Sequence, residues 1–417
     1  MSEQRVPLTP LDDALAQLLA HAGMLQGAEN VSTFDADGRV LAKDVVSALQ
    51  VPPHDNSSMD GYALRCADLT AAGTVLPISQ RIVAGMSGGP LQKGTVARIF
   101  TGAPVPAGAD AVVMQEDCTP CSGPNGIDQV SVNVMAQPGQ WIRRAGEDVM
   151  HGAVVLSKGD RLTPASLGLA ASIGMDRLQV ARQPRVALFS TGDELVMPGE
   201  VAPGDMKPGA IYNSNRFFLR ALLIRLGCTV TDLGIVPDRF DATLDALRNA
   251  AENHDLILTS GGVSVGEEDH IKPAVQVLGE LNLWQIAIKP GKPFAYGRIG
   301  GHNGAAHFMG LPGNPVSSFI TFVVLVRPFL LRLQGVTQVA VKAMALPAHF
   351  TWPKADKRRE FLRVRRNARG GLDLFPNQSS GVLTSAVWGD GMVDNPAGNA
   401  ISVGDVVQFI AFAEMLS

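Results

Sequence analysis

The stretch LILTSGGVSVGEED, residues 256–269, joins an apolar run to adjacent glycines and then to three consecutive acids. The run 256–258, bounded by turn residues, is typical of a short buried strand. Glycine permits positive φ and a close approach to a ligand, so successive backbone N–H groups can form an anion-binding nest. The residues predicted to form this phosphate-binding loop are Thr259, Ser260, Gly261 and Gly262. A single loop of this kind is equally typical of a tight turn.

The region around this loop alternates between strand and helix patterns. Strands are predicted at 185–189, 229–235, 255–258, 283–288 and 306–309, and helices at 215–226 and 242–253, with a further helix after the loop. The apolar residues of the helix at 215–226 recur at helical spacing, and Gly227 marks its end. This alternation predicts a mainly parallel sheet with helices on both faces, whose ligands bind at the carboxyl ends of the strands.

The length of 417 residues predicts about three or four domains. An amphipathic helix is expected at 8–25, and Thr163 with Pro164 predicts a helix at 163–173 that packs with it. The expected domains are an N-terminal helical and linker domain at 1–53 and 141–181, an inserted β-rich domain at 54–140, a central three-layer α/β domain at 182–332, and a small β-barrel-like C-terminal domain at 333–417. The predicted fold class is therefore multidomain α/β plus β.

The bulk composition narrows the class of protein. Its 35 basic and 39 acidic residues indicate neither a nucleic-acid surface nor an anionic-membrane surface. Four cysteines and an N-terminus without a charged and apolar leader predict a cytoplasmic protein. The longest apolar run, 319–326, ends at Arg327 and Pro328, well short of the roughly 20 residues of a membrane span. We therefore expect a soluble protein whose anion binding is local.

Three more strand ends carry glycine-bearing loops, STGDEL at 190–195, IKPGKP at 288–293 and GLPGNP at 310–315. Four such loops at one sheet edge favour a ligand site over simple turns. Acids beside a phosphate need a divalent cation between them, and Mg²⁺ takes one or two carboxylates together with phosphate oxygens. The predicted Mg²⁺ ligands are Glu194 and Asp269, and Asp193 is equally well explained as a cap.

Lys289 and Lys292 lie in a turn restrained by proline and glycine, so their ammonium groups are predicted to converge on an oxyanion. Other signals are weaker. Cys118 and Cys121 have the spacing of a metal knuckle without a second close pair, which favours a hairpin tip. No phosphate-binding P-loop and no dinucleotide fingerprint appears. The basic run 357–366 is interpreted as a solvated or substrate-facing strand edge.

Several motifs together give the chain a family resemblance over essentially its whole length. They are NSSMDGYA, FTGAPVPAGADAVV, RRAGEDV, STGDEL, TSGGVSVGEED, IKPGKP, GLPGNPVSS and RREFLR, in this order. In these motifs the chain resembles the molybdopterin molybdenumtransferase family, which includes the E domain of gephyrin. The resemblance implies an enzyme that takes adenylylated molybdopterin and molybdate, cleaves the phosphoanhydride with Mg²⁺, inserts molybdenum at the dithiolene sulfurs and releases AMP.

The resemblance also implies site residues. The functional polar set is Asp60, Thr101, Asp148, Glu194, Asp238 and Asp269. The substrate-binding set is Thr259, Ser260, Gly261, Gly262, Ser264, Lys289, Lys292, Pro312, Asn314, Arg359 and Ser380. Two positions depart from the family pattern: His270 replaces an expected tyrosine, and Ser379-Ser380-Gly381 replaces a more glycine-rich turn.

The family picture further implies an elongated homodimer in which the inserted β domain of one subunit meets the α/β domain of the other. It also suggests contacts with the molybdopterin adenylyltransferase and with downstream cofactor-insertion proteins. Two alternatives stay open. The first is the adenylyltransferase itself, distinguished by ATP-dependent adenylylation of molybdopterin, and the second is a gephyrin-like scaffold, distinguished by partner binding without any pterin.

Overall fold

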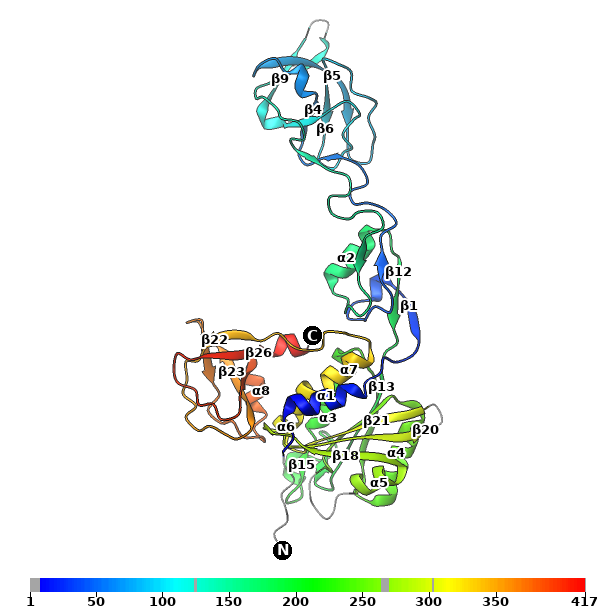
Figure 1. Ribbon diagram of the computed structural model, residues 1–417, viewed down its shortest axis with the longest axis vertical. Coiled ribbons are helices and arrows are strands. Elements are labelled where there is room, and N and C mark those ends of the chain that lie inside the picture. Colours follow the sequence, from blue (N-terminus) through cyan, green and yellow to red (C-terminus); the bar gives the residue numbers. More distant parts are fainter. Residues whose placement is uncertain (1–7, 124–125, 264–269, 302–303, 417) are drawn as a thin grey trace.

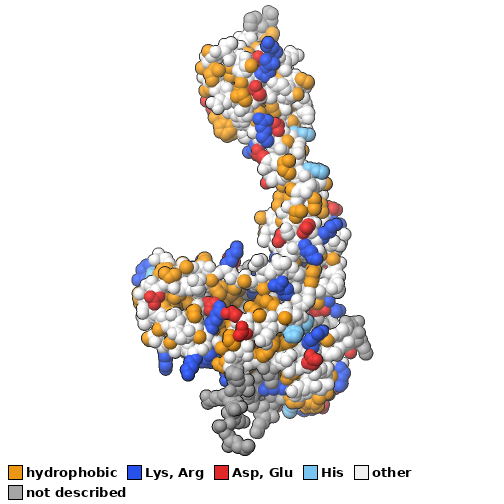
Figure 2. Space-filling model, viewed as in Figure 1, with side chains coloured by type: hydrophobic (Ala, Val, Ile, Leu, Met, Phe, Trp, Pro, Cys, Tyr) orange, Lys and Arg blue, Asp and Glu red, His pale blue; other side chains and the backbone are white. Residues whose placement is uncertain are grey.

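The computed structural model describes residues 8–123, 126–263, 270–301 and 304–416. These residues form an elongated molecule (Figure 1). A distal body at one end contains residues 56–143, and a linker body contains 26–52 and 144–181. At the other end lie an α/β body, residues 182–333 with the helix α1, and a C-terminal body, residues 344–416. Figure 2 shows an open concave side between the distal and C-terminal bodies.

The α/β body is built on a six-stranded sheet of order β16-β13-β17-β21-β20-β18. The parallel strands are β13 (Arg185–Thr191), β16 (Thr229–Val236), β17 (Leu256–Ser260) and β21 (Gly304–Leu311). At one edge β20 (Pro293–Gly301) runs antiparallel to β21, and the outermost strand β18 (Gly279–Gln285) runs antiparallel to β20. The sheet is therefore mixed, and its parallel part confirms the predicted α/β alternation.

The strand expected at 283–288 is wrong in its bounds. Its first residues end β18, whereas β19 (Ile288–Lys289) leaves this sheet and pairs in parallel with β23 of the C-terminal body. The sequence pattern also gave no separate strand for β20, whose residues follow the lysine turn. Short apolar pieces do not reveal by periodicity which sheet they join.

Helices cover both faces of the sheet because neighbouring strand residues point to opposite sides. In β13, Val186 and Leu188 enter one core, while Ala187 and Phe189 enter the other. The helices that contribute to the first core are α3 (Asn215–Arg225), α6 (Pro315–Thr321) and α7 (Arg327–Leu333). Those that contribute to the second are α4 (Phe240–Asn253) and α5 (Ile271–Leu278). The α/β body therefore has three layers.

A continuous helical segment runs from Pro315 to Leu333, with a π-helical stretch at Phe322–Val326 between α6 and α7. The segment has 19 residues and is long and apolar enough to cross a membrane. However, 89% of its most apolar stretch is buried inside the protein. Buried Arg327 donates to the carbonyls of Met415, at 2.9 Å, and of Val339, at 3.1 Å. The segment is thus a core helix that also anchors the C-terminus.

Helix α1 (Leu11–Ala20) packs on α7 and the π-helical stretch, where Leu11, Ala14 and Leu18 are buried. The expectation that the helix at 163–173 would pack with it is wrong. That helix, α2 (Pro164–Ser172), contacts β11 and the short helix at Thr33–Asp35 instead. The apolar stripe of α1 is buried against the α/β body, so it is not available to pack against α2.

The distal body consists mainly of strands, and the linker body combines paired strands with α2. In the linker body β1 (Ala28–Ser32) pairs with β12 (Arg177–Ala181), and β2 (Val45–Val46) pairs with β11 (Val154–Leu156). The distal sheet has the order β7-β4-β6-β5-β9-β8, formed by Ala111–Met114, Gly61–Leu64, Val96–Ile99, Thr74–Ile82, Asp128–Val132 and Cys118–Ser122. The chain enters and leaves the distal body through β3 (Asn56–Ser57) and β10 (Ile142–Arg143), which pair with each other.

The C-terminal body shares the first core with the α/β body through Phe361, Met392 and Ile410. Its sheet has the order β19-β23-β25-β26-β22, with β24 paired to β23. These strands are β22 (Met344–Pro347), β23 (Arg359–Arg366), β24 (Leu372–Leu374), β25 (Gly391–Asn395) and β26 (Val406–Ala411). Two short helices, α8 (Thr384–Trp388) and α9 (Phe412–Leu416), complete it. The shared core joins the two bodies, whereas the distal body stands apart.

A partly buried ion pair ties the linker to the sheet. The guanidinium of Arg182, just after β12, donates to both carboxylate oxygens of Asp255 at 2.8 and 2.7 Å, and to the carbonyl of Gln26 at 2.9 Å. Burial by itself would raise the pKa of Asp255, but hydrogen bonds from Arg182 and from the backbone of Arg185 outweigh it and hold that pKa below its usual value. Asp255 therefore stays ionised in the folded protein.

Changing Arg182 to alanine is expected to lower the free energy of unfolding by about 2 kcal/mol at pH 7, because Asp255 loses its charged partner. A carboxylate with a depressed folded-state pKa stabilises fully above its unfolded pKa of about 3.9 and loses that contribution as pH falls through the folded value. The difference between variant and parent should therefore shrink below about pH 4, as measured by urea unfolding. Arg248→Ala, which breaks an exposed 3.0 Å pair with Asp245, should cost under about 0.5 kcal/mol. Equal losses for both variants would contradict this assignment.

Candidate functional site

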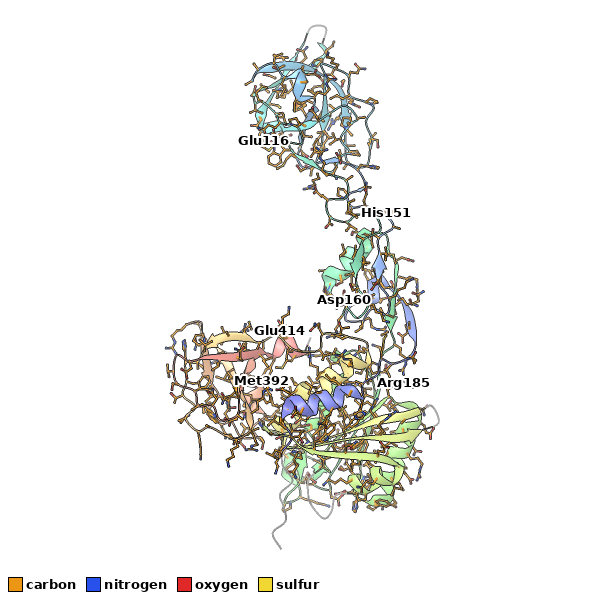
Figure 3. All side chains as sticks on the ribbon, in the orientation of Figure 1. Glu116, His151, Asp160, Arg185, Met392 and Glu414 are labelled. Atoms are coloured by element: carbon orange, nitrogen blue, oxygen red, sulfur yellow. The ribbon has the colours of Figure 1, made fainter. Side chains whose placement is uncertain are left out.

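A cavity of about 580 Å³ lies at the carboxyl edge of the parallel strands. Arg185 marks the amino end of β13 beside the linker body (Figure 3), so this edge faces away from the linker. The lining comes from loops after β13, β17 and β21, from the segment at β15 (Ile211–Tyr212) and the start of α3, and from one C-terminal residue. It consists of Thr191, Glu194, Leu195, Ile211, Tyr212, Asn213, Ser214, Asn215, Ser260, Gly261, Gly313, Asn314, Pro315 and Gly381.

Three of the predicted strand-end loops therefore meet in one cavity. A larger recess, about 760 Å³, lies elsewhere, at the junction of the linker and α/β bodies around Arg161 and Arg225. Arg161 donates at 2.7 Å to the carbonyl of Arg225 there, which explains this recess as a joint between bodies. The convergent polar groups are at the carboxyl edge, and we take that cavity as the candidate site.

Asn215 holds two of the loops together. Its side-chain nitrogen donates to Ser260 Oγ at 2.8 Å and to the carbonyl of Gly313 at 2.7 Å. Asn215 is buried at the first position of α3, where its amide fixes the spacing between the β17 and β21 loops. Asn215 was not predicted from the sequence. In the sequence it is one polar residue at the start of a predicted helix, and nothing local marks it as a bridge between two loops.

The glycines of the β17 loop leave room that a side chain would fill. Gly261 has φ +97°, and a Cβ there would lie 3.0 Å from the carbonyl oxygen of Thr191. Gly262 has φ +67°, and its Cβ would meet Ile271 Cδ1 at 2.5 Å. L-residues rarely adopt this backbone conformation. Glycine at both positions thus allows the turn that exposes the loop backbone to the cavity.

Several buried polar atoms around this edge lack a partner among the described residues. They include Ser190 Oγ, Thr259 Oγ1 and Asn213 Nδ2. An unsatisfied buried polar atom costs about 1 to 3 kcal/mol, so such atoms are usually paired with water or ligand. Asn213 also lines the cavity, and its free donor is suited to an anionic ligand.

Glu194 is exposed on the cavity wall, as expected for a metal ligand. Asp269 and Ser264 lie outside the described residues. Within the described ranges, no group of three or more His, Cys, Asp or Glu side chains is placed to hold a metal ion. Mg²⁺ needs only one or two carboxylates when phosphate and water supply the other oxygens. The Glu194 carboxylate and the amide oxygen of Asn314 therefore fit the donor set of that ion.

The lysine turn sits beside the same helix that closes the cavity. A Cβ at Gly291 would lie 2.5 Å from Thr321 Oγ1 and 3.4 Å from the carbonyl of Ser317, both on α6. Pro315, the first residue of α6, lines the cavity. The turn and the cavity are thus connected through one short helix. Lys292 is exposed and forms no ion pair with another residue in the described part of the chain.

Lys289 is held by acids of the C-terminal body. Its Nζ lies 3.0 Å from Glu360 Oε1 and 3.3 Å from Asp356 Oδ2, and 5.8 Å above the Trp352 ring. Asp356 in turn binds the guanidinium of Arg358 at 3.0 Å. Arg358 was not predicted from the sequence, although it brings a second cation to the acids around Lys289.

Arg359 points away from this group. Its guanidinium donates to Asp394 at 2.6 Å and to Asp12 of α1 at 2.9 Å, and these acids raise its pKa. The register explains the separation, because Lys289 pairs with Glu360 whereas Ile288 pairs with Arg359, and successive strand side chains face opposite sides. The structure therefore places Arg359 in a link between α1 and the C-terminal body.

The remaining predicted residues divide between two regions. Pro312 belongs to the β21 loop, and the carbonyl of Ser380 accepts from Val316 N at 2.9 Å, which brings Gly381 to the cavity wall. Asp238 follows the end of β16 at the same sheet edge but is not part of the lining. His270 directly precedes α5.

Asp60 and Thr101 belong to the distal body and Asp148 to the linker body, whereas the cavity lies in the α/β body. Figure 1 shows the distal body at the opposite end of the molecule from the α/β body. The Thr101 backbone N–H, at 2.8 Å, and then its hydroxyl, at 2.7 Å, donate to Asp60 Oδ1 and lower the pKa of Asp60. Asp148 is exposed near the base of the distal body. Within one chain, Asp60 and Asp148 therefore do not lie close to Glu194.

Comparisons with known proteins match these parts of the chain in order. Family models described as the MoeA N-terminal region (domain I and II), a probable molybdopterin binding domain and the MoeA C-terminal region (domain IV) match residues 9–174, 187–332 and 345–412. The molybdopterin molybdenumtransferase of Haemophilus influenzae is 42% identical over 347 residues, 82% of this chain and 80% of the relative. The chain belongs to the molybdopterin molybdenumtransferase family.

Membership of the molybdopterin molybdenumtransferase family confirms the resemblance seen in the motifs. Molybdopterin molybdenumtransferase 2 of Mycobacterium tuberculosis is 37% identical over 383 residues, 88% of this chain and 90% of that protein. A crystal structure of the molybdopterin biosynthesis moeA protein from Pyrococcus horikoshii matches with a TM-score of 0.83 and 27% identity, covering 97% of this chain and 100% of that one. The whole elongated arrangement is thus similar to that of a solved family member.

Changing Gly261 to alanine should weaken pyrophosphate binding by at least about tenfold, because a Cβ at positive φ strains the loop and crowds Thr191. Gly313→Ala is the matched control, since Gly313 lines the same cavity and no atom lies within 4 Å of its Cβ position. It should bind pyrophosphate within about twofold of the parent by calorimetry. Equal weakening by both changes would argue against the β17 loop as the phosphate cradle.

Proposed function

We propose that this chain is a molybdopterin molybdenumtransferase that inserts molybdate into adenylylated molybdopterin and releases AMP, with Mg²⁺ as cofactor. The observation that carries the proposal is that α6 joins two anion sites, the glycine-lined cavity and the lysine turn. A substrate bearing a diphosphate would occupy the first site and a tetrahedral oxyanion the second. The names of the curated relatives support the same reaction.

The residues act mainly by binding and orientation. The Gly261 loop would hold the phosphates through backbone N–H groups, and Asn215 keeps that loop at a fixed distance from the β21 loop. Lys289, Lys292 and Arg358 would neutralise the oxyanion beside α6. Glu194, with Asp269 as its predicted companion, would hold Mg²⁺, which when bound neutralises charge on the phosphoanhydride. Proximity then brings the dithiolene sulfurs to the molybdate.

We further infer a homodimer in the cytoplasm, with each subunit organised in four domains, of which the α/β domain includes helix α1 as well as residues 182–332. The distal body of one subunit would supply Asp60 and Thr101, and the adjoining linker body Asp148, to the cavity of its partner. The separation of these residues from the cavity within one chain supports this, as does the fixed orientation of the Asp60 carboxylate. All four cysteines are free, which suits a reducing compartment. The adenylyltransferase and cofactor-insertion proteins are the partners that this role suggests.

Glu194→Gln should lower molybdate-dependent AMP release from adenylylated molybdopterin by at least about tenfold, and excess Mg²⁺ should partly restore it, because the neutral amide binds the ion weakly. Asp193→Asn is the control, since this exposed neighbour is not part of the cavity lining. AMP release is measured by chromatography. If the parent protein instead adenylylates molybdopterin with ATP, the adenylyltransferase alternative replaces this proposal.

A shared site can be tested by mixing inactive variants. Asp60→Asn and Glu194→Gln subunits, unfolded and refolded together, should regain about a quarter of parental AMP release, because half of the dimers are mixed and each has one intact site. Each variant alone should stay inactive in the same assay. A mixture that is no more active than the separate variants would place both residues in a site formed by one chain.

A further inference from the structure

Four charged side chains meet at the lysine turn. They are Lys289, Asp356, Arg358 and Glu360, called the Lys289 cluster below. Both acids contact the same ammonium group, Glu360 at 3.0 Å and Asp356 at 3.3 Å. The two cations and two acids cancel, so the formal charge of the cluster is zero. A site for a dianion is expected to carry net positive charge.

The two acids differ in how firmly they are held. Glu360 is 1% exposed, lies on β23 opposite Lys289, and accepts from Trp352 Nε1 at 2.8 Å. The Asn395 side chain approaches it at 3.5 Å. A carboxylate buried in a sheet with these partners has no solvated position to move to. Glu360 therefore stays beside Lys289 whether or not an anion is bound.

Asp356 lies in the loop between Trp352 and β23, and its side chain is 22% exposed. Its carboxylate is bound by the cations of the cluster: Arg358 Nε and a terminal nitrogen each at 3.0 Å, the Arg358 backbone N–H at 3.1 Å, and Lys289. Hydrogen bonding from Arg358, and secondarily from Lys289, keeps the pKa of Asp356 well below its usual range despite partial burial. The side chain can rotate into solvent without leaving a buried charge behind.

The position of Asp356 resembles that of a bound oxyanion. Its two oxygens bridge a guanidinium and an ammonium, the groups that recognise tetrahedral oxyanions in proteins. An incoming dianion would meet a carboxylate between the same two cations, and like charges at such distances repel strongly. The anion and the Asp356 carboxylate therefore cannot both occupy the space between Lys289 and Arg358.

We propose that Asp356 is an internal competitor for the oxyanion site, which must swing out before molybdate binds, and that Glu360 is a fixed positioning residue for Lys289. This inference rests on the proposed function for the identity of the oxyanion. The two acids then affect anion affinity in opposite directions. Asp356 keeps the site closed to weakly held anions, whereas Glu360 keeps the ammonium in place.

The test compares Asp356→Asn with Glu360→Gln in the full-length protein. For Asp356→Asn, the molybdate concentration at half-maximal AMP release should fall by at least about tenfold, with kcat and the requirement for adenylylated molybdopterin within about twofold of the parent. For Glu360→Gln, the molybdate requirement should rise by at least about tenfold. Calorimetric titration with molybdate alone should show the same opposite shifts.

Asp390→Asn is the matched control, because this acid also pairs with an arginine of β23, Arg366 at 3.1 Å, away from the cluster. It should leave the molybdate requirement unchanged. A raised requirement in both cluster variants would show that Asp356 only positions the cations, and would overturn the proposal. If Asp356→Asn unfolds, Asp356→Ala replaces it with the same expected direction.

The assay separates this inference from the proposed function. Absence of AMP release from the parent protein, combined with opposite shifts in calorimetric molybdate binding, would reject the reaction and support the competitor role. Normal AMP release from the parent protein, combined with an unchanged or raised molybdate requirement in Asp356→Asn, would support the reaction and reject the competitor role.

Discussion

The function depends on one geometric constraint, the convergence of parallel strand ends at a single edge of a buried sheet. Strands β13, β17 and β21 run in the same direction between two helical layers, so their loops emerge together. Asn215 then sets the distance between the loops of β17 and β21. Without this parallel arrangement, residues separated by more than a hundred positions in sequence would not line one cavity.

The electrostatics of the site follow from β19, a short strand that comes from the chain of the α/β body but joins the C-terminal sheet. Because β19 pairs with β23, the lysine turn of the α/β body receives side chains from the C-terminal body. Because neighbouring strand residues face opposite sides, Glu360 contacts Lys289, whereas Arg359 contacts Asp394 and Asp12. Two adjacent residues thus serve the lysine turn and the link between α1 and the C-terminal body. Residues of both bodies also pack into one hydrophobic core beside this pairing. The shared core holds the strands of the cluster in place, whereas Asp356 lies in a loop.

Sequence patterns located most of the cavity because several glycine-bearing loops follow predicted parallel strands, whose carboxyl ends meet at one sheet edge. The loops at 190–195, 259–262 and 310–315 were all placed at the sheet edge where they occur. Periodicity was less informative where tertiary partners decide. It did not separate β18 from β19, and it did not show that α2 packs within the linker body instead of on α1. Arg359 came from the family resemblance, whose motif does not show which of the two adjacent arginines faces the lysine turn. Asn215 was missed because a buried amide that bridges two loops has no local signature.

The narrow attachment of the distal body has a mechanical consequence. Its two chain crossings lie side by side, paired over only Asn56–Ser57 and Ile142–Arg143. Besides this ladder, the crossing is held by the ion pair between Arg144 and Asp55. A small rotation at this point would carry Asp60 and Thr101 together, as a preset pair, through a much larger arc. If a second subunit completes the site, as we propose, that site would open and close without any rearrangement inside either sheet.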